Sequence, residues 1–225
     1  MKDINDICIV VQARLGSQRV PRKMIKPFAG TTLIDILLNK LVSLNSTDYS
    51  KVYFCAHEQE LLDIATNYQV NTIKRSKASA NEEKDIKILY EWSKEIPTKH
   101  IVMISACNPL LKINTIDQFI YQYQNSYKEG AISVYESKNY FWNSKGKMLN
   151  KWPKGFTSMN TKYVETTKVA SHCMYGSRVD LIKNGDWVTN KLPYEPELIS
   201  MPELEAFDID EPWQFKIAEV LYENL

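Results

Sequence analysis

The sequence predicts an α/β protein with a mainly parallel sheet that is covered by helices on both faces. Over the first 130 residues, short β-rich runs alternate with longer helical patterns, and helices that cross between strands imply parallel pairing. A length of 225 residues, with 44% hydrophobic and 24% charged residues, suits one globular domain with a substantial core. In such sheets ligands bind where the carboxyl ends of the strands meet the following loops.

The elements of the first half follow from their apolar spacing. The helical segment 31–44 has apolar residues at 33, 34, 37, 38, 41 and 44, and Thr32 with Asp35 resembles a capping box. Asn114 is the expected opening residue of the last helix in this half. We expect strands at 7–11, 52–56, 70–74 and 100–105, and helices at 31–44, 58–68, 85–96 and 115–127.

The pattern changes near residue 131, although 1–225 reads as a single domain. A β-rich segment, 131–170, interrupts the alternation and is predicted to be an inserted arm. It contains a strand at 131–136 and a hairpin at 139–152 with its turn at Ser144-Lys145-Gly146. After it we expect a strand over "VASHCMYGS" and a short helix over "VDLIKNG". Near the end, a strand is expected to deliver Asp208-Ile209-Asp210, with Pro212 in the first turn of a last helix.

Composition excludes several classes of function. The formal net charge of +1 gives no overall basic field for nucleic acid. No run approaches ~18 apolar residues, so no membrane span is expected. The four cysteines lie far apart in or beside apolar segments without a C-x-x-C pair, which favours reduced thiols in a cytoplasm over zinc or redox chemistry.

A basic loop, "QARLGSQRVPRK" (12–23), follows the first predicted strand. Backbone amides around Gly16 and Ser17 can approach phosphate oxygens, and the basic side chains can pair with a polyanion such as a nucleotide triphosphate. The cations are Arg14, Arg19, Arg22 and Lys23. Neither G-x-x-x-x-G-K-[ST] nor G-x-G-x-x-G is present. On charge alone, a solvated basic loop is an equal alternative.

Two carboxylates near the end of the sequence form a second candidate site, besides the basic loop. In an extended chain Asp208 and Asp210 project to the same side and suit Mg²⁺, which takes substrate phosphates as further ligands. The alternative is that Asp210 only caps the last helix. A basic phosphate site with paired carboxylates is typical of phosphoryl or nucleotidyl transfer. His172 and Tyr175, near the expected cleft, are candidates for contact with a second substrate.

These segments together resemble the CMP-sugar synthetases. Those cytidylyltransferases act on acylneuraminate-type nonulosonic acids and on 3-deoxy-octulosonate, with relatives in spore-coat polysaccharide synthesis. The pattern A-R-x-x-S-x-[KR]-x-P-x-K is matched by Ala13, Arg14, Ser17, Arg19, Pro21 and Lys23. "SACNPLLKINTIDQFI" resembles the Pro-Leu turn before a helix in these families, and "AFDIDEPWQFKIAE" is similar to their closing D-x-D-x-P motif.

The resemblance implies a nucleotide-diphospho-sugar transferase (Rossmann-like) fold in a homodimer, with the arm at the dimer contact. It implies CTP in the first loop, Mg²⁺ on Asp208 and Asp210, and catalytic roles for Arg14, Lys23 and Asp208. The implied nucleotide-binding residues are Ala13, Arg14, Gly16, Ser17, Arg19, Lys23, Arg75, Ser105 and Ala106. The expected activity is therefore transfer of CMP from CTP to an acidic sugar, for a surface polysaccharide.

Two departures separate this chain from the branches that it resembles. The octulosonate and spore-coat branches place an acid where this chain has Ala106, which removes one metal ligand. The acylneuraminate branch often has Lys followed by Gly where this chain has Gln18-Arg19. The sequence leaves the sugar and the general base open. A metal-dependent glycosyltransferase that consumes a nucleotide sugar, or a non-catalytic nucleotide-binding subunit, are the alternative functions.

Overall fold

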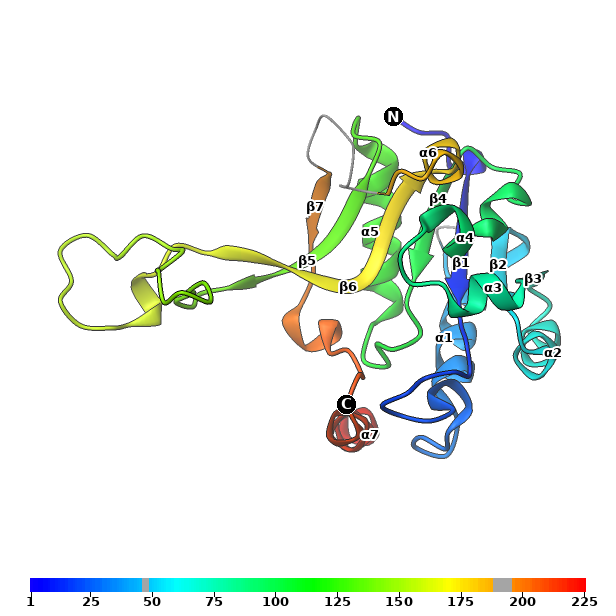
Figure 1. Ribbon diagram of the computed structural model, residues 1–225, viewed down its shortest axis with the longest axis horizontal. Helices are drawn as coiled ribbons and strands as arrows, with labels where there is room; N and C mark the ends of the chain where they lie inside the picture. Colours follow the sequence, from blue (N-terminus) through cyan, green and yellow to red (C-terminus); the bar gives the residue numbers. More distant parts are fainter. Residues whose placement is uncertain (46–48, 188–195) are drawn as a thin grey trace.

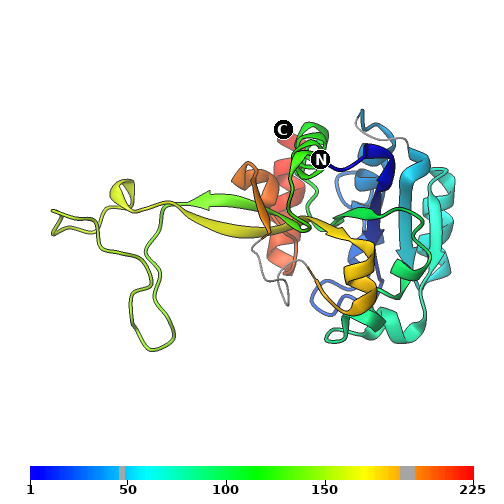
Figure 2. The same cartoon turned by 90° about the horizontal axis from the view of Figure 1, so that it is seen from above.

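A seven-stranded sheet runs through the middle of the protein (Figures 1 and 2). The computed structural model describes residues 1–45, 49–187 and 196–225. The strand order is β3-β2-β1-β4-β6-β5-β7, and every neighbouring pair is parallel except those that involve β6. The predicted α/β fold with a mainly parallel sheet is confirmed. The strands are β1 Ile7–Gln12, β2 Val52–Ala56, β3 Asn71–Lys74, β4 His100–Ile104, β5 Ala131–Ser137, β6 Thr167–Arg178 and β7 Glu197–Ser200.

Helices cover both faces, because the central strands bury both of their faces. In β1, Ile9 and Val11 face a core with α1, α2, α5 and α7, whereas Cys8 and Val10 face a smaller core with η4 and α6. The α-helices are α1 Leu33–Val42, α2 Gln59–Asn67, α3 Lys77–Asn81, α4 Ile86–Leu89, α5 Ile113–Asn125, α6 Val179–Asn184 and α7 Pro212–Asn224. The 3-10 helices are η1 Ile4–Asp6, η2 Lys23–Ile25, η3 Tyr49–Lys51, η4 Glu91–Lys94, η5 Thr161–Tyr163 and η6 Glu203–Ala206.

Two predicted helix starts have different outcomes. Thr32 caps α1 by accepting the backbone N–H of Asp35, as the sequence predicts. Helix α5, however, begins at Ile113 after Lys112, so Asn114 lies inside its first turn and does not open it.

The helix predicted over 85–96 is wrong as one unit. It is divided into α4 and η4 at Tyr90, whose backbone angles (φ −111°, ψ 39°) are not helical. The carbonyl of Leu89 accepts hydrogen bonds from Arg75 Nη2 (3.2 Å) and Ser79 Oγ (3.0 Å). We attribute the break to this competition for a backbone acceptor, together with the burial of Trp92 in the smaller core.

The strand predicted to deliver Asp208 and Asp210 is also wrong. β7 ends at Ser200, η6 follows, and the two aspartates lie in an irregular segment before α7. The backbone N–H of Ile209 donates to the carbonyl of Cys107 (3.0 Å), and this bond fixes the segment without a sheet ladder. Pro212 begins α7, as predicted.

The inserted arm projects away from the sheet as an extension of β5 and β6 (Figures 1 and 2). Beyond the two strands, the predicted hairpin is reduced to a single bridge between Trp142 and Met148. Its aromatic rings contact one another, for example Tyr140 with Trp152 (centroids 5.3 Å apart) and Phe156 stacked on Tyr163 (4.1 Å). The rings therefore form small clusters within the arm.

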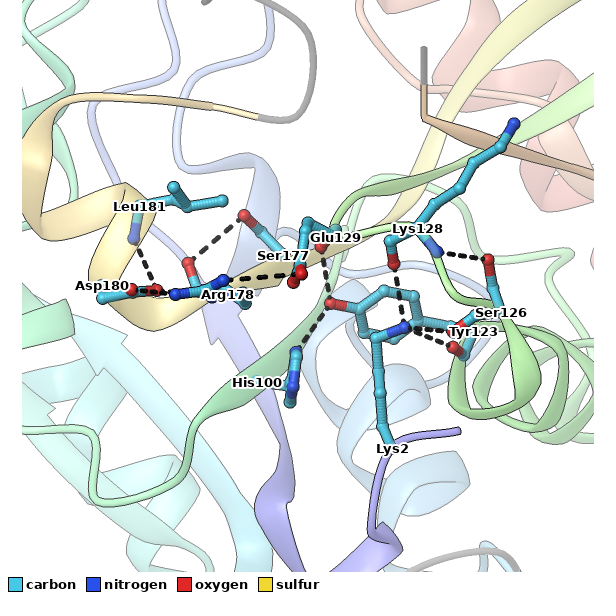
Figure 3. A network of polar contacts seen from close by, with 10 residues as sticks. All are labelled: Lys2, His100, Tyr123, Ser126, Lys128, Glu129, Ser177, Arg178, Asp180 and Leu181. Atoms are coloured by element: carbon cyan, nitrogen blue, oxygen red, sulfur yellow. Dashed lines mark hydrogen bonds and ion pairs between the residues drawn. The ribbon is translucent and has the colours of Figure 1, made fainter. Parts of the chain in front are cut away.

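A polar network connects α5 with β6 at the end of the sheet opposite the carboxyl ends of the parallel strands (Figure 3). Tyr123 Oη donates to the carbonyl of Glu129 (3.0 Å) and lies 3.2 Å from His100 Nδ1. A Cβ atom at Gly176 would lie 2.8 Å from the ring of Tyr123, so only glycine leaves room for it. Lys2 Nζ donates to three carbonyls at the end of α5, including that of Ser126 (2.7 Å).

Four cysteines of the described chain, Cys8, Cys55, Cys107 and Cys173, are free thiols. Among the described residues, no helix is both long and apolar enough to cross a membrane.

Candidate active site

A cavity of about 590 Å³ opens at the carboxyl ends of β1, β3 and β4. Nine residues predicted from the sequence line it: Ala13, Arg14, Ser17, Arg19, Lys23, Arg75, Ser105, Ala106 and Asp210. The structure adds Gln12, Gln18, Met24, Ala80, Glu82, Glu83, Leu89 and Cys107. The loop after β1 and the segment before α7, which are nearly 200 residues apart in the chain, thus meet at one cavity.

The loop after β1 forms a cationic end of this cavity. Lys23 is only 7% exposed, its Nζ donates to the carbonyl of Ile209, and it lies 3.8 Å from Asp210 Oδ1. Arg19 Nη2 lies 2.8 Å from the same carboxylate oxygen, and its Nη1 lies 3.1 Å from Glu211. Because the Lys23 ammonium is held in place by a backbone carbonyl, it is a fixed charge at this end of the cavity.

The four cations of the loop do not act together. Arg14 Nη1 donates to the carbonyl of Ala80 and its Nη2 to Glu83, both at 3.2 Å, so it joins the loop to the far wall. Arg22 has a left-handed backbone (φ 53°) and forms an ion pair with Glu60 at 2.7 Å. Arg22 is not among the residues that line the cavity.

Gly16 was expected to let the loop backbone approach phosphate oxygens in the cavity, but it does not line the cavity. Nothing lies within 4 Å of a Cβ built at Gly16, so within the protein a side chain would meet open space. The backbone N–H of Ser17 already donates to the carbonyl of Leu15 (2.9 Å). The Ser17 amide is therefore already satisfied within the loop.

A second part of the cavity wall is formed by a short segment wrapped around Arg75. This guanidinium is 2% exposed and donates to Ser79 Oγ (3.0 Å), to the Ser79 carbonyl (2.6 Å) and to the Leu89 carbonyl (3.2 Å). Burial lowers the pKa of Arg75. The side wall comes from Ser105, whose N–H donates to the carbonyl of Cys173 on β6 (2.8 Å).

Asp208 and Asp210 differ in their surroundings. Oδ1 of Asp208 is buried and has no hydrogen-bond partner among the described residues. Burial, and next the charge of Asp210, raise the pKa of Asp208. Asp210 lines the cavity and pairs with Arg19. The two carboxylates are thus close enough to influence each other, but only Asp210 is among the residues that line the cavity.

The alternative that Asp210 caps the last helix is wrong. Glu211 is the N-cap residue of α7, and it forms a capping box with Gln214. The role of the Asp210 side chain is thus separate from the start of the helix.

The donor set fits a hard divalent cation only if a ligand completes it. The unpaired oxygen of Asp208 and the neighbouring carboxylate of Asp210 are oxygen donors of the kind that Mg²⁺ prefers. In the part of the chain that the structure describes, no group of three or more acidic, histidine or cysteine side chains is arranged to hold a metal. Phosphate oxygens of a substrate would have to supply the remaining ligands.

His172 and Tyr175 lie on an irregular stretch of β6. The register of β6 against β5 shifts at this point, and His172 has a left-handed backbone (φ 56°), which is unusual for a non-glycine residue. His172 Nδ1 lies 2.8 Å from Tyr175 Oη. Buried Ser133 and Ser171 (Oγ atoms 2.5 Å apart) fill the bulge, and Ser133 Oγ also accepts the N–H of Met174. Neither predicted residue lines the nucleotide-sized cavity itself.

Gln12 and the 77–89 wall were missed by sequence reasoning. A signal for Gln12 was available, because it is the polar end of an otherwise apolar strand and directly precedes the basic loop. No comparable signal marks Ala80 or Leu89, because they reach the cavity only through the fold around Arg75.

Comparisons with known proteins find relatives in sequence and in fold. The chain is 24% identical to the spore coat polysaccharide biosynthesis protein SpsF of Bacillus subtilis over 136 residues, 59% of this chain and 54% of the relative, so the match spans about half of that protein. Among solved structures, it is similar to a CMP:2-keto-3-deoxy-manno-octonic acid synthetase complexed with CTP (TM-score 0.67, 13% identity, 97% of this chain and 99% of that one).

Two further structures share the fold. One is a cytidylyltransferase from Leptospira borgpetersenii (TM-score 0.61, 16% identity, 98% and 87% coverage). The other is a 4-diphosphocytidyl-2C-methyl-D-erythritol synthase from Anaerococcus prevotii (TM-score 0.64, 12% identity, 96% and 97%). The sequence model described as cytidylyltransferase matches residues 7–172, from β1 to the bulge of β6. With a cavity whose cationic end is formed by the loop after β1, and with that match over most of its length, the chain belongs to the cytidylyltransferase family.

Proposed function

We propose that this protein transfers CMP from CTP to an acidic sugar of the nonulosonic type, giving a CMP-sugar and pyrophosphate for surface polysaccharide synthesis. The observation that supports it most is the elongated lining of the cavity, with Arg19 and the buried Lys23 beside Asp210 and with Ala80 and Leu89 in another part of the wall. A nucleotide triphosphate has the same division between its phosphates and its base.

In the proposed reaction the anomeric hydroxyl oxygen of the sugar attacks the α-phosphorus of CTP in line. The bond from the α-phosphorus to the bridging oxygen breaks, pyrophosphate leaves with the electron pair, and the hydroxyl proton passes to a base or to solvent. The protein positions both reactants and neutralises charge that moves onto the pyrophosphate. Arg14, Arg19 and Lys23 carry that charge neutralisation.

Asp208 and Asp210 would hold Mg²⁺ in this proposal. When bound, the ion supplies positive charge to the triphosphate. The unpaired oxygen of Asp208 supports the assignment, because a buried carboxylate oxygen without a partner is costly unless a ligand occupies it.

The acceptor sugar would lie beside His172 and Tyr175. His172 is exposed and held in a strained backbone conformation, and such strain concentrates at functional sites. Its hydrogen bond to Tyr175 fixes the ring orientation. The two side chains offer a hydroxyl and an imidazole to the hydroxyl and carboxylate groups of an acidic sugar.

Pyrophosphate release with CTP, Mg²⁺ and a panel of acidic sugars tests this function directly. A transferase releases pyrophosphate with at least one acidic sugar, whereas a glycosyltransferase that consumes a nucleotide sugar releases none. A non-catalytic subunit would bind CTP in calorimetry without any turnover. No pyrophosphate release with any acidic sugar of the panel would refute the proposal, whether or not CTP binds.

We further propose that the protein is a homodimer in which the arm of one copy contacts the second copy. Between residues 137 and 164 there are six lysines and no acid, whereas residues 197–225 contain eight acids and one lysine. Trp142 and Trp152 on the arm, and Trp213, Ile217 and Val220 along one face of α7, are exposed. This opposition of charge, with apolar surface on both sides, suits an arm that docks on the partner's C-terminal segment.

Light scattering at micromolar concentration tests the dimer. We expect twice the chain mass for the wild type, and a monomer after Trp213→Glu with Ile217→Glu on α7. A wild-type monomer, or a dimer that is indifferent to these substitutions, would count against this contact.

We also place the protein in the cytoplasm. Four free cysteines support this proposal, because oxidising compartments favour disulfides.

A further inference from the structure

Gln12 is a polar side chain of the cavity wall to which neither the matched pattern, which starts at Ala13, nor the proposed chemistry assigns a role. It is the last residue of β1, next to Ala13, and it lines the cavity together with Arg75 and Leu89. Arg19 and Lys23, the two cations beside Asp210, mark the phosphate end of the cavity. A base whose phosphates lie on the loop would therefore face Gln12.

The orientation of the Gln12 amide is fixed by its neighbour. Trp92 Nε1 lies 2.5 Å from Gln12 Oε1. An indole N–H can only donate, so the amide oxygen must face Trp92 and the amide nitrogen must face away. Trp92 is fully buried in the smaller core, so the donor cannot swing aside. The sequence offers no sign of this pairing, because 80 residues separate the two.

The part of the Gln12 amide that is left for a ligand is its NH2 group, which can only donate hydrogen bonds. In the described part of the chain no protein atom accepts a hydrogen bond from Gln12 Nε2, while the side chain is partly exposed to the cavity. Two N–H groups are thus available to a ligand at this end.

We propose that Gln12, oriented by Trp92, selects cytosine over uracil in the nucleotide substrate. Cytosine presents two adjacent acceptors, O2 and N3, to which a donor-only amide can donate. Uracil carries a hydrogen on N3, so the same amide would meet a donor there and both groups would lose a partner. A site built around a hydrogen bond rejects the analogue that cannot make it. This inference rests on the proposed use of CTP.

The test compares CTP with UTP for the wild type and three variants. Gln12→Met keeps the length of the side chain and removes its donors. We expect it to lower kcat/KM for CTP by about 10- to 100-fold, the range for one paired base contact, and to leave the UTP value nearly unchanged. Gln18→Met is the matched control, because Gln18 is an exposed glutamine of the same cavity at the phosphate end. Its CTP-to-UTP ratio should equal that of the wild type.

Trp92→Phe tests the orienting role separately. Without the indole N–H the amide is free to turn its oxygen to the cavity, where it can accept from N3 of uracil. We expect the CTP-to-UTP ratio to fall about 10-fold while kcat with CTP changes less. Thermal melts show whether Trp92→Phe is folded. If Trp92→Phe is unfolded, the CTP-to-UTP ratio of Gln12→Met still tests the proposal.

Binding measurements separate this inference from the transferase proposal. Calorimetry gives the ratio of the dissociation constants for CTP and UTP without turnover. A wild type that binds CTP more tightly than UTP but is inactive would refute the transferase, and the binding ratio of Gln12→Met would still test the role of Gln12. Equal losses for both nucleotides in Gln12→Met would show a structural role and overturn the inference. An unchanged ratio in this variant would overturn it as well.

Discussion

Asp210→Asn separates a metal-binding role from a structural one, and the structure sets both magnitudes. The carboxylate forms an ion pair with Arg19 in which both side chains are about half exposed, so its loss costs at most ~1 kcal/mol of stability. For a chain of this size that corresponds to roughly 2–4 °C in Tm. The cap of α7 is unaffected, because Glu211 supplies it.

The expected loss of activity is much larger. A neutral amide holds a hard dication poorly, and loss of one interaction aimed at developing charge typically costs about 10²–10³ in kcat. Glu211→Gln is the matched control, because Glu211 pairs with the same Arg19 and has a similar exposure. We expect it to retain most of the activity.

The assay is a Mg²⁺ titration of pyrophosphate release for the wild type and both variants, with thermal melts alongside. A large loss of rate and a shifted Mg²⁺ dependence for Asp210→Asn alone, with a nearly unchanged melt, is the expected result. If Asp210→Asn keeps the wild-type rate and metal dependence, the reasoning that places a metal on these aspartates is wrong.

Three further changes test other parts of the structure. Lys23→Met keeps the buried stem but removes the fixed ammonium, so kcat for pyrophosphate release should fall ~10²-fold, whereas the unpaired Ile209 carbonyl should cost only about 1–3 kcal/mol of stability; near-normal turnover would mean that the cation has no role. Gly176→Ala should lower the free energy of unfolding in urea by about 1–3 kcal/mol, because its Cβ would overlap the buried ring of Tyr123; unchanged stability would contradict this contact. Burial lowers the pKa of Lys40 from 10.5 to about 8, so the wild type loses stability as pH falls across that interval. Lys40→Met should therefore raise the unfolding free energy by up to ~3 kcal/mol at pH 7, and this gain should disappear near pH 10.5; a gain that is independent of pH would refute the assignment.

The parallel part of the fold could be predicted because each of its elements has a local signal. β1 and β2 are continuous apolar runs, and α1 combines a helical apolar face with the Thr32 cap. The predicted helix 85–96 has the right apolar spacing as well. It fails because Arg75, 14 residues earlier in the chain, takes a backbone acceptor that the helix would use. Competition of this kind has no local signature.

The candidate site was predictable where a loop carries the chemistry. Arg14, Arg19 and Lys23 were found because charge and spacing mark them, and the structure brings them to one cavity. Arg22 carries the same charge but pairs with Glu60 outside the cavity. Its left-handed backbone, which the sequence does not indicate, accompanies this different direction. Gln12 was missed because its importance depends on an indole from another part of the chain.

The antiparallel strand β6 divides the site between two halves of the chain. Residues up to about 110 supply most of the nucleotide cavity, whereas His172 and Tyr175 come from the strand inserted between β4 and β5. If His172 and Tyr175 contact the acceptor as proposed, nucleotide choice and acceptor choice are encoded in separate stretches of the gene. Recombination near residues 126–130, between α5 and β5, could exchange one without rewriting the other, provided that the seam between β4 and β6 still matches. Under the proposed function, proteins with this architecture can therefore change their acceptor while they keep the same nucleotide-binding half.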